Sequence, residues 1–338
     1  MELTIDTPLD LHLHLREEDM LKLVTPFSAA QFAGGVVMPN LIQPVDSLER
    51  LRTYRRQILQ ACGAEPFTPY MTLFFRDYNR EELLAAKDEI IGLKLYPAGI
   101  TTQSEGGVRD FNHIGETVAL LEELDIPLLI HGETSGFVMD REREFLTVYQ
   151  WLAENFPRLR IVMEHITTAE AVEFLDRFDN VAATVTLHHL LITLDDVAGG
   201  SLQPDLFCKP IAKTSRDREA LRRAVFSGHP RLFFGSDSAP HPRHKKECCG
   251  CAAGIFSAPV ALPMLTQLFE ENNALAQLPG FVSNYGRQFY RISPPEKKVT
   301  LERTPWRVPK RYETTKPFLN DEVLRWRMKN QPETSGNH

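Results

Sequence analysis

Five short stretches of the sequence carry side chains that can bind metal ions or move protons. They are His12-Leu-His14-Leu-Arg16, Lys94-Leu-Tyr96-Pro97, His131-Gly-Glu133, Glu164-His165-Ile-Thr167 and Ser236-Asp237-Ser-Ala-Pro240-His241. The first stretch, read as a strand, places its leucines on one face and its polar side chains on the other. The leucines are Leu9, Leu11, Leu13 and Leu15, and the polar residues are Asp10, His12, His14 and Arg16. Two imidazoles on one strand face can reach the same metal ion if that face borders a protected cavity.

The other stretches supply further ligands of the same kind. The full set of candidate ligands is His12, His14, His131, His165 and Asp237. Four imidazoles and a carboxylate suit zinc or a similar borderline metal. They exceed the needs of one tetrahedral site, so two metal ions that share a bridging ligand would use them better.

Lys94 is the unusual member, because it interrupts the apolar run from Ile90 to Pro97. Burial of an unpaired ammonium is costly, so we expect its pKa to fall toward neutrality. A neutral lysine amine can add carbon dioxide and become a carbamate, whose two oxygens can bridge two metals. The alternative is a buried lysine paired with a carboxylate. The surrounding ligands favour the carbamate.

Asp237 and Arg16 have both structural and chemical interpretations. Asp237 could be a turn or N-cap residue, but its place after Leu232-Phe-Phe-Gly235 favours a strand end. A carboxylate beside a metal-bound hydroxide can take a proton and pass it to a leaving nitrogen. The Arg16 fork suits a substrate carboxylate, with a structural salt bridge as the alternative. The remaining histidines are expected to be hydrogen-bonded core or surface residues: His113, His188, His189, His229 and His244.

Apolar, β-rich runs recur along the chain, with amphipathic and charge-rich segments between most of them. The runs lie near residues 8–15, 34–40, 67–75, 90–97, 126–132, 160–166, 181–187 and 231–237. The segments include 47–62, 79–88, 112–124, 141–155 and 168–178. This alternation predicts an α/β fold, a closed (β/α)8 TIM barrel. A doubly wound open sheet is less favoured, because no Gly-rich dinucleotide-binding motif follows an early strand.

The barrel would explain how five distant stretches form one site. The carboxyl ends of barrel strands meet at one mouth, where catalysis takes place. The long connection 190–213 could be a lid or a substrate loop. We expect residues 1–338 to form one domain, with the barrel over about 8–290 and a C-terminal extension over about 291–338 that frays from Gln331.

The bulk composition limits the classes of partner. An apolar fraction of 43% is ample for a core, and a net charge of −7 argues against nucleic-acid and membrane-surface partners. No membrane span or secretory signal is visible. Five cysteines suit a reducing cytoplasm. Three of them, Cys248, Cys249 and Cys251, could suggest zinc, but a Gly-rich loop near a site is favoured because no second cysteine pair completes a thiolate site.

Taken in order, the motifs resemble those of the dihydroorotases of the amidohydrolase superfamily, in the shorter type that is nearly all barrel. The resemblance covers about residues 8–290 and is poor after about 295. Besides the stretches given above, it includes Met38-Pro-Asn40, Thr101-Thr102 and Thr168.

The resemblance implies a role for each of these residues. His12, His14 and Asp237 would hold one zinc ion, and His131 and His165 the other. N6-carboxylated Lys94 and a hydroxide would bridge the two ions. Arg16, Asn40 and His241 would hold the substrate carboxylate, while backbone groups of Lys209 and Ala253 would meet the ring amide. Thr101 and Thr102 would lie on a mobile loop that closes over the substrate.

The implied reaction is the reversible cyclisation of N-carbamoyl-L-aspartate to L-dihydroorotate in pyrimidine synthesis. Asp237 would relay the proton to the departing amide nitrogen. The sequence departs from the family at Lys209, a position that is more usually apolar, and in detail around Cys248 to Gly254. Ala253 could therefore be displaced by one residue.

Two other functions remain open. A cyclic amidohydrolase for hydantoin or allantoin would share the metal ligands, but Arg16, Asn40 and His241 call for a substrate carboxylate. A catalytically dead barrel that assembles with another enzyme should have lost ligands, and this chain keeps all six. We also expect a cytoplasmic homodimer with a small-molecule substrate and no nucleic-acid or membrane partner.

Overall fold

A computed structural model describes residues 1–329 and contains a sheet of eight parallel strands in sequence order. The strands are β2 (Leu9–Leu13), β3 (Gly34–Val37), β4 (Thr68–Phe74), β5 (Gly92–Leu95), β6 (Leu128–Ile130), β7 (Ile161–Met163), β8 (Val181–Val185) and β9 (Leu232–Phe234). The last strand meets the first, since Leu13 forms a parallel bridge with Ser238 and the Asp237 N–H donates to the His12 carbonyl at 2.8 Å. The predicted (β/α)8 barrel is therefore confirmed.

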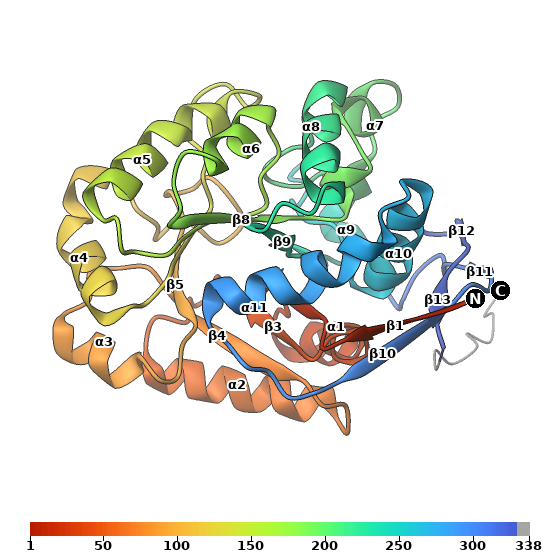
Figure 1. Ribbon diagram of the computed structural model, residues 1–338, viewed down its shortest axis with the longest axis horizontal. Helices are drawn as coiled ribbons and strands as arrows, with labels where there is room; N and C mark the ends of the chain where they lie inside the picture. The colour runs from red at the N-terminus through yellow and green to blue at the C-terminus, as the bar shows by residue number, and fades with distance from the viewer. Residues whose placement is uncertain (330–338) are drawn as a thin grey trace.

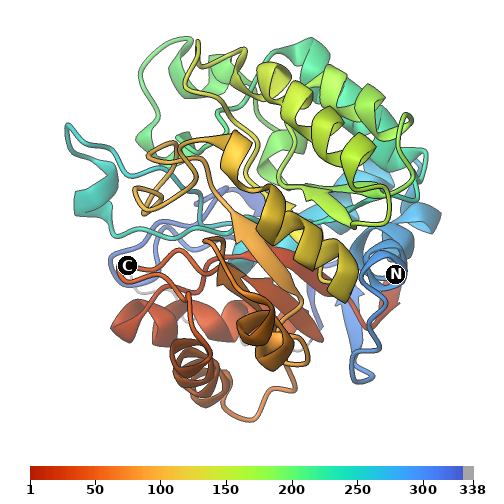
Figure 2. The same ribbon diagram turned by 90° about the vertical axis from the view of Figure 1, so that its left-hand side faces the viewer.

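Helices surround this sheet on the outside (Figures 1 and 2). They are α1 (Glu18–Gln31), α2 (Leu48–Cys62), α3 (Arg80–Ala86), α4 (Gly115–Leu124), α5 (Arg141–Asn155), α6 (Ala169–Leu175) and α8 (Ser215–Phe226). Several begin at a side-chain cap: Asn79 and Thr214 form capping boxes, and Thr168 accepts from the Ala171 N–H. All eight predicted strands and all five predicted helical segments are present; α5 has the predicted bounds, and the other elements are shorter than predicted.

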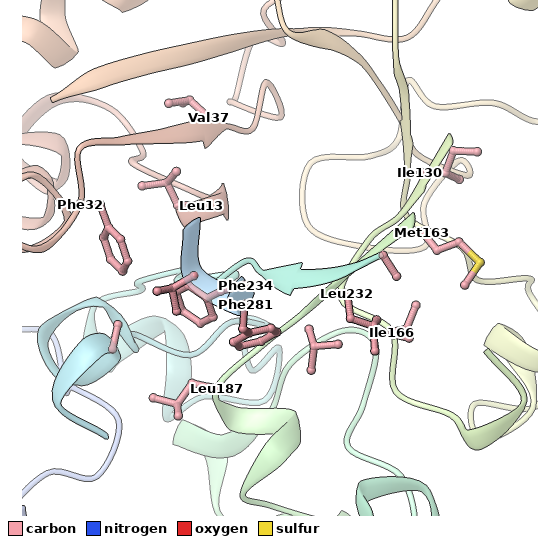
Figure 3. Close-up of a cluster of buried hydrophobic side chains, with 14 of the residues drawn as sticks. Leu13, Phe32, Val37, Ile130, Met163, Ile166, Leu187, Leu232, Phe234 and Phe281 are labelled. Atoms are coloured by element: carbon pink, nitrogen blue, oxygen red, sulfur yellow. The ribbon is translucent and has the colours of Figure 1, made fainter. Parts of the chain in front are cut away.

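The core has two layers that follow the alternation of strand residues. The central residue of the short strands, such as Leu129, Val162 and Phe233, packs inside the barrel. Their neighbours pack outward against the helices. Figure 3 shows part of this outer layer, in which Phe234 lies between Phe32 and Phe281 at ring-centroid distances of 5.8 and 6.0 Å.

One end of the barrel is closed by the π-helix η6 (Gly280–Asn284) and by α11 (Tyr285–Tyr290), which crosses the strands in Figure 1. Phe289 and Tyr290 pack against Phe233 with tilted rings, and Tyr290 joins the interior cluster. This end lies at the amino-terminal ends of the strands, so the mouth at their carboxyl ends stays accessible.

The C-terminal extension is paired with the N-terminus. Antiparallel strands β1 (Glu2–Asp6), β10 (Lys298–Glu302) and β13 (Arg327–Met328) form a separate sheet, and β11 (Trp306–Arg307) pairs with β12 (Val323–Leu324). The sequence reading did not anticipate these strands. The expected frayed terminus from Gln331 lies outside the described residues.

Further helices lie in the connections and in the segment after β9. They are η1 (Phe111–His113), η2 (His188–Leu190), α7 (Leu194–Ala198), η3 (Pro204–Leu206), α9 (Arg243–Lys246), η4 (Ala258–Val260), α10 (Ala261–Glu271) and η5 (Leu275–Gln277). The connection 190–213 is therefore partly helical. Within residues 1–329, no helix combines the length and apolar character needed to cross a membrane.

Candidate functional site

The histidine-bearing strand β2 differs from the simple alternation expected for it. Leu9 and Leu11 pack inside the barrel, whereas Leu13 and Leu15 pack in the outer layer. The expectation that all four leucines share one face is therefore wrong. The register of β2 against β3 shifts between Asp10 and Leu13, and such an irregularity changes the direction in which the following side chains point.

His12, within this irregularity, and His14, just after it, both meet Asp237. The Nε2 atoms of His12 and His14 lie 3.5 and 3.0 Å from Asp237 Oδ1. His12 and Asp237 are buried, and His14 is nearly so. The three residues form a group whose donor atoms all lie close enough to hold one metal ion.

His131 and His165 form a second pair next to the first group. His131 Nδ1 lies 3.1 Å from His165 Nε2, and the ring centroids of His165 and His12 are 5.0 Å apart. His165 Nδ1 is buried and has no hydrogen-bond partner within residues 1–329. The predicted convergence of strand ends thus brings all four histidines and Asp237 together.

Lys94 lies on β5 and is completely buried. Within the described part of the chain its Nζ has no hydrogen-bond partner, which argues against the paired-lysine alternative. Burial lowers its pKa to about 8, although the nearby charges of Glu164 and Asp237 act in the opposite direction. A substantial fraction of the amine is therefore neutral near physiological pH, as carbamate formation requires.

Carboxylates behind the histidines hold the imidazoles in place. Glu164 Oε2 lies 2.6 Å from His12 Nδ1 and accepts a second bond from Thr184 Oγ1 at 2.6 Å. Glu133 Oε2 lies 2.8 Å from His131 Nε2. Such partners fix the tautomer and orientation of metal-binding histidines. The motifs contain both glutamates, but no role was predicted for them.

Asp10 supports the same region from the strand itself. Its Oδ1 accepts from the Ser236 N–H at 2.8 Å and from the His12 N–H at 3.3 Å. Complete burial raises its pKa to about 7. Asp10 therefore ties β2 to the segment that carries Asp237.

Three site residues have left-handed backbone conformations. The φ angles are 59° at Arg16, 42° at His165 and 42° at Asp237. Such conformations are uncommon for residues other than glycine and cluster at functional sites.

Arg16 and His241, predicted to hold a carboxylate, are neighbours at the mouth. Arg16 Nη2 lies 2.9 Å from His241 Nε2, which is 3.0 Å from the Ala253 carbonyl oxygen. Burial lowers the pKa of His241 to about 3, so its imidazole is neutral. Arg16 Nε also donates to the Pro240 carbonyl.

Asn40 lies at the same mouth and is oriented by Tyr96. The Tyr96 hydroxyl donates to Asn40 Oδ1 at 2.9 Å, and Asn40 Nδ2 donates to the Thr102 carbonyl at 3.0 Å. The cavity at the mouth is lined by His12, His14, Arg16, Asn40, Tyr96, Thr101, Thr102, His131, His165, Lys209, Asp237, Ala239, Ala253 and Gly254. Of the predicted site residues, Lys94 and His241 do not line it.

A buried group outside this site consists of His188, His189 and Cys208. His189 fits the prediction of a hydrogen-bonded core residue, since its ring nitrogens lie 2.9 Å from Thr186 Oγ1 and 3.1 Å from the Pro210 carbonyl. For His188 the prediction is wrong, because neither ring nitrogen has a partner within residues 1–329.

The cysteine-rich segment is a loop beside the site. Cys248 and Cys249 are exposed and Cys251 is half-buried, while the following Ala253 and Gly254 line the cavity. This arrangement agrees with the favoured interpretation of a loop near the site.

Comparison with known proteins shows which family builds such a site. Residues 10–263 match the family model described as amidohydrolase. A dihydroorotase from Helicobacter hepaticus is 43% identical over 341 residues, covering 97% of this chain and 98% of the relative. The chain belongs to the dihydroorotases of the amidohydrolase family.

Solved structures of dihydroorotases agree with this assignment. A dihydroorotase from Campylobacter jejuni superposes with a TM-score of 0.93 at 50% identity and covers 97% of each chain. A dihydroorotase from Saccharomyces cerevisiae, solved in complex with 5-fluoroorotic acid, gives a TM-score of 0.90 at 34% identity. It covers 97% of this chain and 98% of the yeast protein. The dihydroorotase similarity therefore extends over the whole barrel and most of the C-terminal extension.

Proposed function

We propose that the chain catalyses the reversible cyclisation of N-carbamoyl-L-aspartate to L-dihydroorotate with a binuclear zinc centre, in pyrimidine (UMP) biosynthesis. Membership of the dihydroorotases makes it a hydrolase of cyclic amides. The observation that carries the proposal is the mouth itself. Its lining includes five of the candidate ligands together with Arg16 and Asn40, which supports a metal centre beside a carboxylate-binding group.

The donor set fits two metal ions. His12, His14 and Asp237 would hold one ion, His131 and His165 the other, and carboxylated Lys94 would bridge them. The buried unpartnered Lys94 Nζ supports this assignment, because such a group is costly unless a ligand completes it. His131 Nδ1 and His165 Nε2 face each other and are the atoms that would bind the second ion. Bound zinc would polarise the reacting carbonyl and supply an activated water.

Lys94 would become the bridging ligand by reaction with carbon dioxide. Its neutral amine attacks carbon dioxide, the new N–C bond forms, and the ammonium proton is lost to solvent. The carbamate is anionic and has two oxygens that can bind metal ions. The original ammonium is positive and would repel them. The lowered pKa of Lys94 favours this step.

Asp237 moves the proton. In the ring-opening direction it accepts a proton from the attacking water and donates it to the departing amide nitrogen, and ring closure reverses the transfer. Burial raises the pKa of Asp237, which brings its protonated form closer to working pH.

Arg16, Asn40 and His241 hold the substrate carboxylate. The guanidinium provides a fork that matches two carboxylate oxygens, and the neutral His241 and the Asn40 amide add hydrogen-bonding capacity. Lys209 and Ala253 line the same cavity, and their backbone groups would meet the ring amide. Thr101 and Thr102 would close over the substrate.

The test is turnover of dihydroorotate against hydantoin by the purified, zinc-loaded protein. Dihydroorotate carries a carboxylate that hydantoin lacks, so we expect much the larger kcat/KM for dihydroorotate. Faster turnover of hydantoin would overturn the choice of substrate. Fewer than one tightly bound metal ion per chain, together with no turnover, would favour an inactive assembly partner.

The location and assembly are part of the same proposal. A cytoplasmic enzyme fits five cysteines that are all free. We further propose that the protein is a homodimer. Light scattering on the purified protein would test this. The proposal that residues 1–338 form one domain predicts a single cooperative unfolding transition.

A further inference from the structure

The segment between β5 and η1 forms a loop with a fixed base and a separate tip. At the base, the Ala98 N–H donates to Val108 and the Val108 N–H to Tyr96, at 2.9 and 2.8 Å. Gly107 lies so close to Tyr96 that a Cβ atom there would come within 2.3 Å of the Tyr96 carbonyl oxygen. The base is therefore locked to the end of β5.

Within residues 1–329, the tip, residues 100–103, is bonded only to residues that flank it in the loop, apart from its contacts across the mouth. The Gly99 N–H donates to the Ser104 carbonyl at 2.9 Å, and the Ile100 N–H donates to the Pro97 carbonyl at 3.4 Å. Ser104 Oγ accepts from the Thr101 N–H and donates to the Thr101 carbonyl, at 3.0 and 2.8 Å. Gly99 has a φ of 71° and open space around its Cα, so it can act as a hinge between base and tip. The position of the tip must then depend on what it contacts across the mouth.

Two contacts hold the tip from different parts of the barrel. Asn40, which follows β3, donates to the Thr102 carbonyl at 3.0 Å. Lys209, in the connection after β8, donates from Nζ to the Ile100 carbonyl at 2.6 Å. In the order β2 to β9, four strands separate β3 from β8 on one side and two on the other. The tip therefore spans the mouth between these two anchors.

We propose that the Lys209 ammonium is the latch that holds residues 100–103 closed over the substrate cavity. Only its backbone was expected to take part in binding, and a charged side chain at this position was unexplained. An apolar side chain could not donate to the Ile100 carbonyl. Lys209 is thus a positioning residue that acts through the loop, and this assignment rests on the proposed function of that loop.

The surroundings of Lys209 favour a strong bond. The side chain is half-buried, so water competes less for both the ammonium and the carbonyl. A charged donor makes a shorter and stronger hydrogen bond than a neutral one, in agreement with the 2.6 Å separation. Loss of such a bond should shift the opening equilibrium of the tip about tenfold.

The first test uses the ligand-free protein and does not depend on activity. We expect amide hydrogen exchange at Gly99 and Thr101 to be about tenfold faster in Lys209→Met than in the unsubstituted chain. Lys209→Arg keeps a donor and should restore much of the protection. Lys245→Met removes the same charge from an exposed lysine of α9 and should leave the exchange unchanged. Equal exchange in Lys209→Met and the unsubstituted protein would overturn the latch.

The second test asks whether Lys209 acts through the loop or on the ligand. We would measure the dissociation rate of 5-fluoroorotate by fluorine NMR for the zinc-loaded holoenzyme. The four proteins are the unsubstituted chain, Lys209→Met, a chain with Ile100–Gln103 replaced by two glycines, and the combination. We expect Lys209→Met to speed dissociation about tenfold in the full-length loop and to change little in the shortened loop.

The outcomes separate the latch from the proposed function. Equal acceleration in both loop backgrounds would show that the ammonium contacts the ligand itself, which overturns the latch. If exchange responds to Lys209→Met but the unsubstituted holoenzyme does not open dihydroorotate, the proposed function fails while the latch stands.

Discussion

Lys94 is the residue whose chemistry most directly tests the binuclear centre. We expect Lys94→Ala to lower kcat about 1,000-fold or more, because the anionic group proposed to bridge the two metal ions is lost. Short-chain carboxylic acids such as propionate should restore part of the rate by replacing the bridge. Kinetics and metal analysis would check this, with the exposed Lys87→Ala as control. Near-normal turnover in Lys94→Ala would contradict the bridging role.

Substitution of Asp237 should lower the rate of the chemical step much more than it weakens substrate binding. In Asp237→Asn the side chain can no longer accept the proton from water, so kcat should fall about 100- to 10,000-fold. Binding of dihydroorotate should weaken far less, because Arg16, Asn40 and His241 are unchanged. Steady-state kinetics and ligand titration measure both quantities, and metal content must be compared. A loss confined to KM would argue against proton transfer by Asp237.

Substitution of Glu164 tests whether the carboxylate that contacts His12 contributes to metal binding. Glu164→Gln keeps the shape but removes the charge beside His12 Nδ1, so we expect a 10- to 100-fold loss of metal affinity. Competition with a chelator would measure the affinity. Glu173→Gln on the outer helix α6 is a suitable control, since it removes the same charge far from the metal ligands. Unchanged metal affinity in Glu164→Gln would show that His12 is oriented by other contacts.

At the scale of elements, the irregularity in β2 depends on a close approach by β3. A Cβ atom on Gly35 would lie 2.9 Å from the Asp10 carbonyl oxygen and 2.7 Å from Leu13 Cδ2. We expect Gly35→Ala to lower the free energy of unfolding by about 1–3 kcal/mol, since the backbone must shift. Chemical denaturation would measure the change.

A matched glycine provides the control for this prediction. Gly115, the first residue of α4, has no heavy atom within 4 Å of a built Cβ. Gly115→Ala should be neutral or stabilise the fold by up to about 1 kcal/mol. Similar effects of the two substitutions would contradict the importance of the β2–β3 approach.

Some features of these elements can be predicted from the sequence, and others cannot. The eight barrel strands and the meeting of His12, His131, His165 and Asp237 follow from hydrophobic runs and from the shared direction of parallel strands. The division of the leucines in β2 does not, because it depends on the register between two strands. The bond from Lys209 to Ile100 joins residues that are 109 positions apart, and periodicity carries no information about it.

The terminal sheet was missed for a different reason. Its strand β13 and the separate pair β11 and β12 contain two residues each and lie in a segment rich in proline and charge. Their pairing comes from tertiary contacts, such as the bond from Trp306 Nε1 to the Trp326 carbonyl. Local propensity gives little signal for such short strands.

At the scale of the whole molecule, the cysteines should differ sharply in reactivity. Burial raises the pKa of Cys62 to about 11 and that of Cys208 to about 12, so both stay protonated at neutral pH, and the thiolate is the nucleophile. We expect a thiol reagent to modify Cys248 and Cys249 quickly and Cys251 more slowly. Cys62 and Cys208 should react only after denaturation.

Peptide mass analysis after labelling at pH 7 would identify the modified residues. Cys248→Ser should remove one fast-reacting thiol and leave the slow ones unchanged. Rapid labelling of Cys208 in the folded protein would show that the interior opens more readily than its packing implies.

The closure of the barrel between β2 and β9 has a consequence for how the protein is made. During synthesis, His12 and His14 leave the ribosome before Asp237, which follows more than two hundred residues later. The proposed first metal position would therefore not exist until β9 has docked against β2. An ion bound there would join the two ends of a nearly finished ring and would bind only the closed form. Metal uptake would then be coupled to the last step of barrel assembly, and removal of the metal should open the molecule first along this seam.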